Sequence, residues 1–219
     1  MLPPIPNRLS RIDATTLDQH FFLQPTDACF YIWEYTRRVG YHASPTNSLI
    51  ANFKKKPLRI VDNPPEQSHK QRAIHHCAAA LRALIERSWL ETQATLVPVP
   101  GSKLPGHPDH DDRLIQLLQR AFQNYALDAR PLIEQTQSTR ADHERSARQR
   151  FDELIEITRI NEAAAQPTRP ILVVVDDVLN TGKHFKVAEQ LLAQRFPSAT
   201  IRGLFLARCR HQSAAPASP

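Results

Sequence analysis

The sequence is poor in glycine and cysteine and has no long apolar run, and each shortage excludes a class of protein. Only 5 of the 219 residues are glycine, and no segment matches the G-x-x-x-x-G-K-[ST] loop of P-loop NTPases. Cys29, Cys77 and Cys209 lie far apart with no C-x-x-C pair, which excludes a zinc ribbon or a redox pair and predicts free thiols in a reducing compartment. No apolar run approaches the ~18 residues of a membrane-spanning helix.

The sequence predicts no targeting segment and contains no dense basic block. Residues 1–6 contain no basic start followed by an apolar core, so we expect no signal peptide, no membrane partner and a cytoplasmic protein. The net charge of +6 is a mild excess that can attract phosphates, nucleotides or nucleic acid. The longest basic run is Lys54-Lys55-Lys56, which we interpret as a solvated turn rather than a nucleic-acid contact.

Predicted strands alternate with predicted helices from residue 69 onward. The apolar run 171–175 is unbroken, as in a strand covered on both faces within a parallel sheet. The pattern predicts an α/β fold with a mainly parallel sheet flanked by helices. We expect strands over 29–35, 95–100, 129–135, 171–175 and 200–207, and helices over 48–54, 69–91, 111–125 and 182–195. Residues 57–68, with three prolines, are interpreted as a connector.

Two carboxylates follow the apolar strand, and a short loop leads from them into a predicted helix. Exposed N–H groups at a helix N-terminus bind anions. Gly182 lets the backbone approach a phosphate closely, and Thr181 adds a hydroxyl donor. The neighbouring Asp176 and Asp177 suit sugar hydroxyls, or Mg²⁺ bound directly or through water. A phosphate site beside hydroxyl acceptors predicts a ribose 5-phosphate site.

The segment 174–182 resembles the phosphoribosyl-pyrophosphate motif of type I phosphoribosyltransferases, which consists of an apolar strand, two acidic residues, an apolar spacer and Thr-Gly. The resemblance implies the type I phosphoribosyltransferase fold, with a small hood-like N-terminal subdomain in residues 1–60, a core over 61–210 and a disordered tail over 211–219. It implies catalytic and Mg²⁺-binding roles for Asp176 and Asp177 at the ribose hydroxyls. It assigns the 5-phosphate to Val178, Leu179, Asn180, Thr181, Gly182, Lys183 and His184.

The segment 97–103 resembles the pyrophosphate loop of the ComF-like, or competence-associated, branch of this family. The resemblance implies that pyrophosphate is bound by Gly101, Ser102 and Lys103. It also implies an arginine-rich lid over 136–150, with Arg140 and Arg145 as catalytic residues. The chain departs from the branch at three points: it has His184 in place of a Thr or Ser, Arg148 in place of an Asn, and no N-terminal zinc ribbon.

The activity implied by the resemblance is glycosyl transfer with Mg²⁺ as cofactor. The phosphoribosyl group of phosphoribosyl pyrophosphate would pass to a nitrogen nucleophile with release of pyrophosphate. The alternative is a non-catalytic protein that binds a nucleotide or phosphoribosyl ligand and acts as sensor or adaptor with a nucleic-acid-handling partner. A third hypothesis is hydrolysis of an N-glycosidic bond in the same pocket. The sequence does not determine the acceptor, or whether the protein is a homo-oligomer.

Two histidine-containing segments are given structural interpretations. Residues 107–112 hold two histidines and three aspartates, which we interpret as a loop in which Asp111 or Asp112 caps the next helix, rather than as a metal site. His75 and His76 are neighbours on a predicted helix, where adjacent side chains point in different directions. We therefore expect neither segment to bind a metal.

Overall fold

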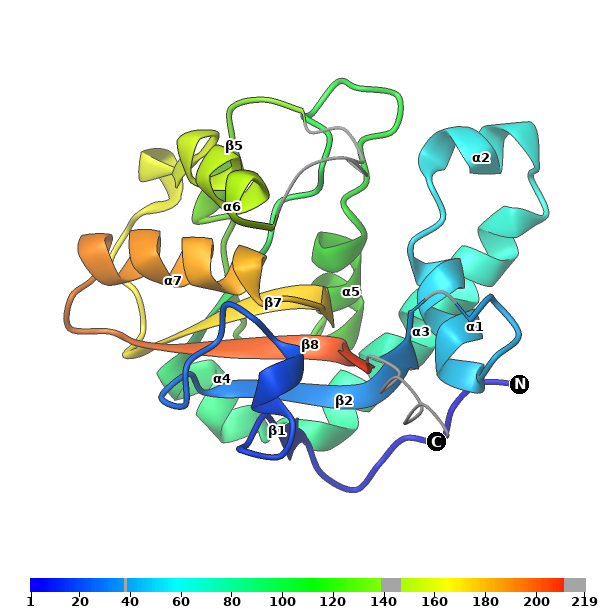
Figure 1. Cartoon of the computed structure of the whole chain (residues 1–219), viewed down its shortest axis with the longest axis horizontal. Coiled ribbons are helices and arrows are strands. Elements are labelled where there is room, and N and C mark those ends of the chain that lie inside the picture. The colour runs from blue at the N-terminus through cyan, green and yellow to red at the C-terminus, as the bar shows by residue number, and fades with distance from the viewer. Residues whose placement is uncertain (38, 139–146, 211–219) are drawn as a thin grey trace, which may run out of the picture.

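A six-stranded, mainly parallel sheet forms the centre of the protein (Figure 1). The computed structural model describes residues 1–37, 39–138 and 147–210. In the strand order β1-β2-β8-β7-β3-β4, β1 pairs antiparallel with β2 and the other neighbours pair in parallel. The strands are β1 (Ser10–Arg11), β2 (Cys29–Thr36), β3 (Ala94–Pro98), β4 (Asp128–Ala129), β7 (Ile171–Leu179) and β8 (Thr200–Arg210). The prediction of an α/β fold with a mainly parallel sheet flanked by helices is confirmed.

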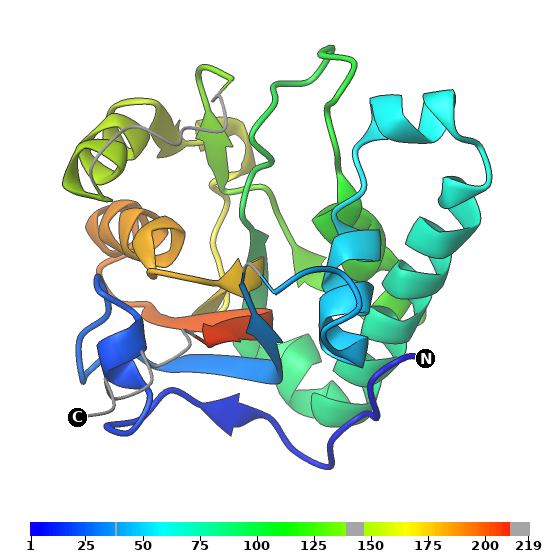
Figure 2. The same cartoon turned by 45° about the vertical axis from the view of Figure 1, so that its right-hand side comes forward.

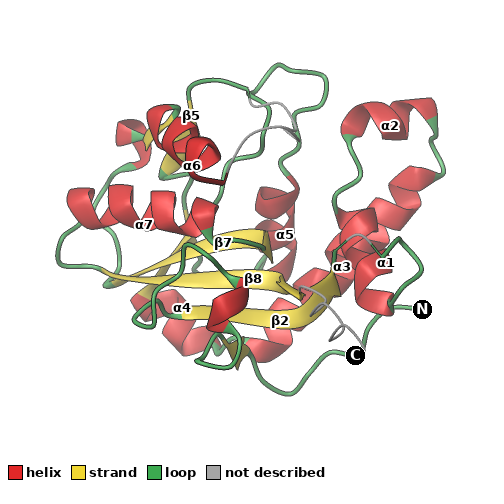
Figure 3. Ribbon diagram, in the orientation of Figure 1, coloured by secondary structure: helices red, strands yellow, loops and turns green. Residues whose placement is uncertain are grey.

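Helices cover both faces of this sheet (Figure 3). Side chains alternate along a strand, so Val173 and Val175 of β7 pack into one apolar cluster and Leu172 and Val174 into another. The first cluster includes residues of α1, α3, α4 and α5, and the second includes residues of α7. The helices are α1 (Pro45–Phe53), α2 (Pro57–Asp62), α3 (Glu66–Leu84), α4 (Arg87–Gln93), α5 (Arg113–Ala121), α6 (Ala147–Glu156) and α7 (Lys183–Arg195).

The carboxyl edge of the sheet is flanked by two further groups of elements. A small antiparallel pair, β5 (Ile133–Gln135) and β6 (Thr158–Ile160), lies with α6 on one side. Figure 2 shows α1, α2 and α3 on the opposite side, with the loop that follows β3 rising between the two groups. None of the helices in the described part of the chain is long and apolar enough to cross a membrane.

Several predicted boundaries were wrong, and local chemistry explains the differences. The helix predicted over 69–91 is two helices, because Ile85 is extended and the side chain of Glu86 caps α4 by accepting from the backbone N–H groups of Ser88 and Trp89. The strand predicted over 129–135 is interrupted between β4 and β5, where Pro131 has no N–H to donate. The helix predicted over 111–125 is shorter, and β7 and β8 are longer than expected.

The region predicted as a connector, 57–68, is largely helical. Pro57 occupies the first turn of α2, where its fixed φ and missing N–H are tolerated. Pro65 likewise directly precedes α3. The preceding helix, α1, begins earlier than predicted and is capped by Ser44, whose side chain accepts from the backbone N–H of Asn47. Proline in this region therefore starts helices and does not exclude them.

Candidate functional site

A pocket of about 780 Å³ opens where β3 and β7 end. Ligands of parallel α/β sheets bind at this edge, outside the carboxyl ends of the strands. Its lining combines residues 98–105, which follow β3, with residues 176–185, and adds the start of α5, the end of α1 and part of β5. The structure thus brings the two segments singled out in the sequence, 101–103 and 176–184, into one pocket.

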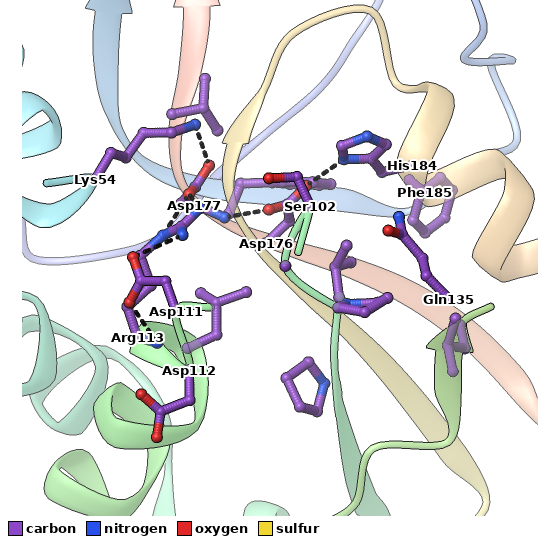
Figure 4. A pocket seen from close by; sticks show the side chains of 18 of the residues that line it. Lys54, Ser102, Asp111, Asp112, Arg113, Gln135, Asp176, Asp177, His184 and Phe185 are labelled. Carbon is purple, nitrogen blue, oxygen red and sulfur yellow. Dashed lines mark hydrogen bonds and ion pairs between the residues drawn. The ribbon is translucent and has the colours of Figure 1, made fainter. Parts of the chain in front are cut away.

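Asp176 is held at the pocket floor by short-range contacts. Its Oδ1 accepts from the backbone N–H of Asp177 at 2.7 Å. Its Oδ2 lies 3.3 Å from Nδ1 of His184, in the first turn of α7. Figure 4 shows this carboxylate between His184 and the side chain of Ser102. Asp176 lines the pocket, so its carboxylate is in position to accept hydrogen bonds from a ligand.

Asp177, in contrast, is engaged by two cations. Its Oδ1 accepts from Nζ of Lys54 at 2.9 Å. Its Oδ2 accepts from Nη2 and Nε of Arg113 at 2.6 and 3.0 Å. Arg113 also donates to Asp111, and Asp111 accepts from the buried Lys70 at 2.7 Å. We call the chain Lys54–Asp177–Arg113–Asp111–Lys70 the ion-pair chain. Figure 4 shows its members from Lys54 to Asp111.

The ion-pair chain shifts the pKa of two of its members, Asp177 and Arg113, whose side chains are largely removed from water. Burial alone would raise the pKa of Asp177, but Lys54 and Arg113 outweigh it and hold that pKa well below the ordinary value of 3.8. Burial would likewise lower the pKa of Arg113, but Asp177 and Asp111 raise it above its usual range. The ion-pair chain joins α1, α3, α5 and β7, so Asp177 links the sheet to three helices.

The loop 180–182 is fixed by an N-terminal segment, residues 17–27, which we call the strap. His20 is fully buried, and its Nδ1 lies 2.5 Å from the carbonyl oxygen of Asn180. Since a carbonyl can only accept, Nδ1 carries the proton in this contact. The backbone N–H of Phe22 donates to the Thr181 carbonyl at 2.9 Å. The strap therefore engages both carbonyls in hydrogen bonds.

Gly182 is the N-cap of α7 and adopts φ +86°, a conformation that favours glycine. A Cβ at this position would also lie 2.7 Å from the Leu23 side chain of the strap. Both the backbone conformation and the close approach of the strap thus require glycine. The predicted helix start at Gly182 is confirmed to within one residue.

We expect Gly182→Ala to lower the free energy of unfolding more than Gly106→Ala does. Gly106 has φ +87° with nothing within 4 Å of an added Cβ, so it carries only the backbone strain of about 1–2 kcal/mol. Gly182→Ala adds crowding against Leu23, worth roughly 1–3 kcal/mol more. Urea denaturation of the two variants measures the difference.

A double-mutant cycle with Leu23→Ala isolates the part of the stability loss that comes from crowding between Leu23 and the new Cβ at position 182. The pair Leu23→Ala/Gly182→Ala is expected to be more stable than the sum of the single effects predicts. Equal costs at Gly182 and Gly106, or additive effects in the cycle, would show that the strap does not press on Gly182.

The loop after β3 contributes the residues predicted to bind pyrophosphate. Gly101, Ser102 and Lys103 all line the pocket. A Cβ at Gly101 would lie 3.2 Å from the carbonyl oxygen of Asp111, so the loop packs closely against the residues that precede α5. The Lys103 carbonyl lies 2.8 Å from Nδ1 of His110. These contacts hold the loop across the pocket from the Asn180-Thr181-Gly182 turn.

The structure places the other predicted residues as follows. All of residues 178–184 line the pocket. Val178 and Leu179 do so from the end of β7, where Leu179 is buried. The strand predicted over 171–175 was too short: it continues to Leu179, and the turn begins at Asn180. Arg140 and Arg145, predicted as catalytic, lie outside the described residues, as does the predicted tail 211–219. Gln137 is exposed.

The described residues offer a divalent cation only part of a coordination shell. No group of three or more His, Cys, Asp or Glu side chains suited to a metal occurs in the described part of the chain. Both oxygens of Asp177 are taken by cations, so Asp177 does not fit the predicted metal-binding role. Asp176 can supply one carboxylate. Mg²⁺ is commonly held by one or two carboxylates together with substrate phosphates, so the site fits Mg²⁺ that is shared with a phosphorylated ligand.

Residues 107–112 form a loop before α5, as the sequence predicted, but the predicted side-chain cap by Asp112 is not formed. Asp112 occupies the N-cap position of α5, but its side chain makes no capping hydrogen bond, and Asp111 belongs to the ion-pair chain. His76 donates through Nε2 to the Pro3 carbonyl at 2.8 Å and stacks on Trp33.

Sequence reasoning missed Lys54, Arg113 and His20 as parts of the site. Lys54 stood at the end of a predicted helix and was treated as a solvated residue. Arg113 and His20 belong to no motif. Arg113 is 64 residues from its partner Asp177 in the sequence, and His20 is 160 residues from Asn180. Only Asp111, as a carboxylate just before an amphipathic helix, gave a local signal.

Comparison with known proteins adds no family assignment. No protein-family model matches the chain, and a search of curated proteins found no match. The structure defines an α/β protein whose parallel sheet carries, at its carboxyl edge, a pocket lined by a carboxylate, a glycine-capped helix start and a lysine-containing loop.

Proposed function

We propose that the protein binds phosphoribosyl pyrophosphate together with Mg²⁺ and transfers the phosphoribosyl group to a nitrogen nucleophile. The observation that carries this proposal is the convergence of Asp176, the Gly182 turn at the start of α7 and the 101–103 loop on one pocket. The three parts suit the three parts of the ligand: ribose hydroxyls, 5-phosphate and pyrophosphate.

The 5-phosphate is assigned to the turn 180–184. The backbone N–H groups at the start of α7 and the positive end of its dipole favour an anion. Lys183 and His184 line the pocket at this turn. His184 replaces the hydroxyl residue of the related motif with an imidazole, which can donate a hydrogen bond to a phosphate oxygen.

Ribose and pyrophosphate take the remaining groups of this half of the pocket. The Asp176 carboxylate accepts from the ribose hydroxyls, and the backbone N–H groups and Lys103 of the other loop hold the pyrophosphate. Mg²⁺, when bound with the ligand and held by Asp176, would neutralise part of the pyrophosphate charge.

In the reaction, the C1–nitrogen bond forms and the C1–oxygen bond to pyrophosphate breaks, so pyrophosphate leaves with the bonding electron pair. The positive charge that develops on the ribose resembles that of glycoside hydrolysis. The residues of this chain contribute by orienting the ligand, by stabilising the departing anion and by excluding water.

Calorimetric titration with phosphoribosyl pyrophosphate and Mg²⁺ tests the proposal. We expect a dissociation constant between about 1 μM and 1 mM, the usual range of Michaelis constants, and weaker binding of ribose 5-phosphate and of pyrophosphate alone. Pyrophosphate release in the presence of nitrogen heterocycles then tests turnover. Wild-type protein that binds none of these ligands would contradict the proposal.

A second candidate, a non-catalytic binding protein, is favoured by the pairing of Asp177. Its carboxylate is neutralised by Lys54 and Arg113, which leaves one carboxylate of the motif for a ligand. Such a protein would bind a nucleotide or phosphoribosyl ligand and act as sensor or adaptor for a nucleic-acid-handling partner. Binding of phosphoribosyl pyrophosphate without pyrophosphate release from any acceptor would support this candidate.

A further inference from the structure

The pocket extends beyond Asp177 into a part that the phosphoribosyl group does not fill in the arrangement proposed above. We call this part the acceptor wing; it lies where β2, β7 and β8 end, beside α1. Its walls carry an aromatic ring, aliphatic groups and a thiol. The residues are Tyr35, Arg37, Ile50, Lys54, Val178 and Cys209.

The ion-pair chain delivers positive charge to this wing. It contains three cations, Lys54, Arg113 and Lys70, against two carboxylates, Asp177 and Asp111. The Arg113 donors contact Asp177 and Asp111, and Lys70 is buried. Lys54 is the member that reaches solvent, with 45% of its side chain exposed. One of its three donors serves Asp177, which leaves the others for a ligand.

Arg37 adds a second cation to the same wing. It lines the pocket, and its residue is exposed. Within the described ranges, no ion pair involves Arg37, whereas Lys54 has Asp177 as its only carboxylate partner. An arginine side chain offers a planar fork of donors that suits a carboxylate or a phosphate.

We propose that the acceptor is a flat nitrogen heterocycle carrying an anionic group, a carboxylate or a phosphate, which binds Lys54 and Arg37. This inference rests on the proposed function, since it assigns the second substrate of the same site. Tyr35, Ile50 and Val178 supply the apolar walls that a ring needs, and the two cations lie at the same wing.

The charge balance favours an anionic over a neutral acceptor. A ligand that fills the wing removes water from Lys54 and Arg37, and a desolvated cation is costly without an anionic partner. A carboxylate compensates for that loss, but the corresponding amide, which has nearly the same shape, does so only in part. The cations also attract an anion before contact.

Matched acid–amide pairs test the inference, with orotate against orotamide and nicotinate against nicotinamide. Pyrophosphate release and calorimetry are measured on the full-length protein saturated with phosphoribosyl pyrophosphate. We expect kcat/KM for at least one acid to exceed that of its amide by about tenfold or more, as for hydrogen bonds between charged groups. Arg37→Gln and Lys54→Gln are expected to reduce this ratio toward one. Lys56→Gln, which removes the same charge from a residue that does not line the pocket, is the matched control.

Three outcomes would overturn the inference. In the first, the amides react or bind as well as the acids. In the second, no acid binds to the saturated protein. In the third, the acid–amide ratio of kcat/KM is unchanged in both Arg37→Gln and Lys54→Gln. In each of these cases the titration with phosphoribosyl pyrophosphate still stands as the test of the proposed function. A wild-type protein that does not bind phosphoribosyl pyrophosphate would instead overturn both proposals.

Discussion

Asp177→Asn is expected to lower the free energy of unfolding by about 3–5 kcal/mol at neutral pH, the cost of removing one partner from a buried ion pair. The substitution keeps the size of the side chain but leaves Arg113 and Lys54 without their shared anion. Arg113 is 19% exposed at its side chain and Asp177 4%, so water replaces little of the lost interaction. Urea denaturation of the variant and of wild-type protein measures the loss.

Asp112→Asn serves as the control, because Asp112 is exposed at the start of α5 and contacts Gln116 instead of a cation. We expect that variant to lie within about 0.5 kcal/mol of wild type, as for most surface substitutions. Adding Lys54→Met to Asp177→Asn is expected to recover part of the loss, since it removes one of the unpaired cations. An Asp177→Asn variant as stable as Asp112→Asn would refute the structural role of the ion-pair chain.

The same carboxylate predicts how stability depends on pH. Because the pKa of Asp177 is lower in the folded protein than its ordinary value of 3.8, the folded state favours the ionised form. Its contribution to stability is present above about pH 4 and is lost as pH falls further toward the folded pKa. The stability difference between wild type and Asp177→Asn should therefore shrink below about pH 4.

Asp176→Asn is expected to weaken binding of phosphoribosyl pyrophosphate by about 10- to 100-fold, which corresponds to the loss of a hydrogen bond to a charged acceptor. Stability should change little, because the Asn side-chain oxygen can still accept from the Asp177 backbone N–H, the 2.7 Å contact that fixes the carboxylate. Calorimetry with Mg²⁺ present measures binding, and urea denaturation measures stability.

Asp109→Asn is the matched control for Asp176→Asn. Asp109 is a carboxylate of the loop between β3 and α5, but it does not line the pocket. Its replacement should leave the dissociation constant unchanged within about twofold. Unchanged affinity in Asp176→Asn would exclude Asp176 as a ribose ligand. A loss of stability as large as that of Asp177→Asn would show that its role is structural.

The two adjacent aspartates are therefore expected to differ in role, with Asp176 binding a ligand and Asp177 stabilising the fold, and this difference affects the choice of experiment. A double substitution of Asp176 and Asp177 would combine a binding defect with a folding defect. Asp176 contacts His184 in the first turn of α7, whereas Asp177 contacts Lys54 at the end of α1 and Arg113 at the start of α5. Single substitutions with a stability measurement distinguish the two roles.

The sequence predicted the central elements because their signals are local. The unbroken apolar run of β7 indicated a strand covered on both faces, and Gly182 marked the start of α7 to within one residue. Boundaries that depend on capping and on individual prolines were less accurate. The extended Ile85 between α3 and α4 interrupts apolar residues that keep the same helical spacing, so periodicity did not reveal it.

The sequence alone determined that two carboxylates, a turn and a helix start follow one buried strand, since neighbours along the chain remain neighbours in space. The alternation of strands and helices also determined that the loop after β3 would meet this turn at the same edge of a sheet. Only the tertiary structure decided which carboxylate is available to a ligand. Lys54 is 123 residues from Asp177, and His20 is 160 residues from Asn180. Periodicity indicates which face of an element is buried, but the ion pairs and the strap depend on which elements pack together.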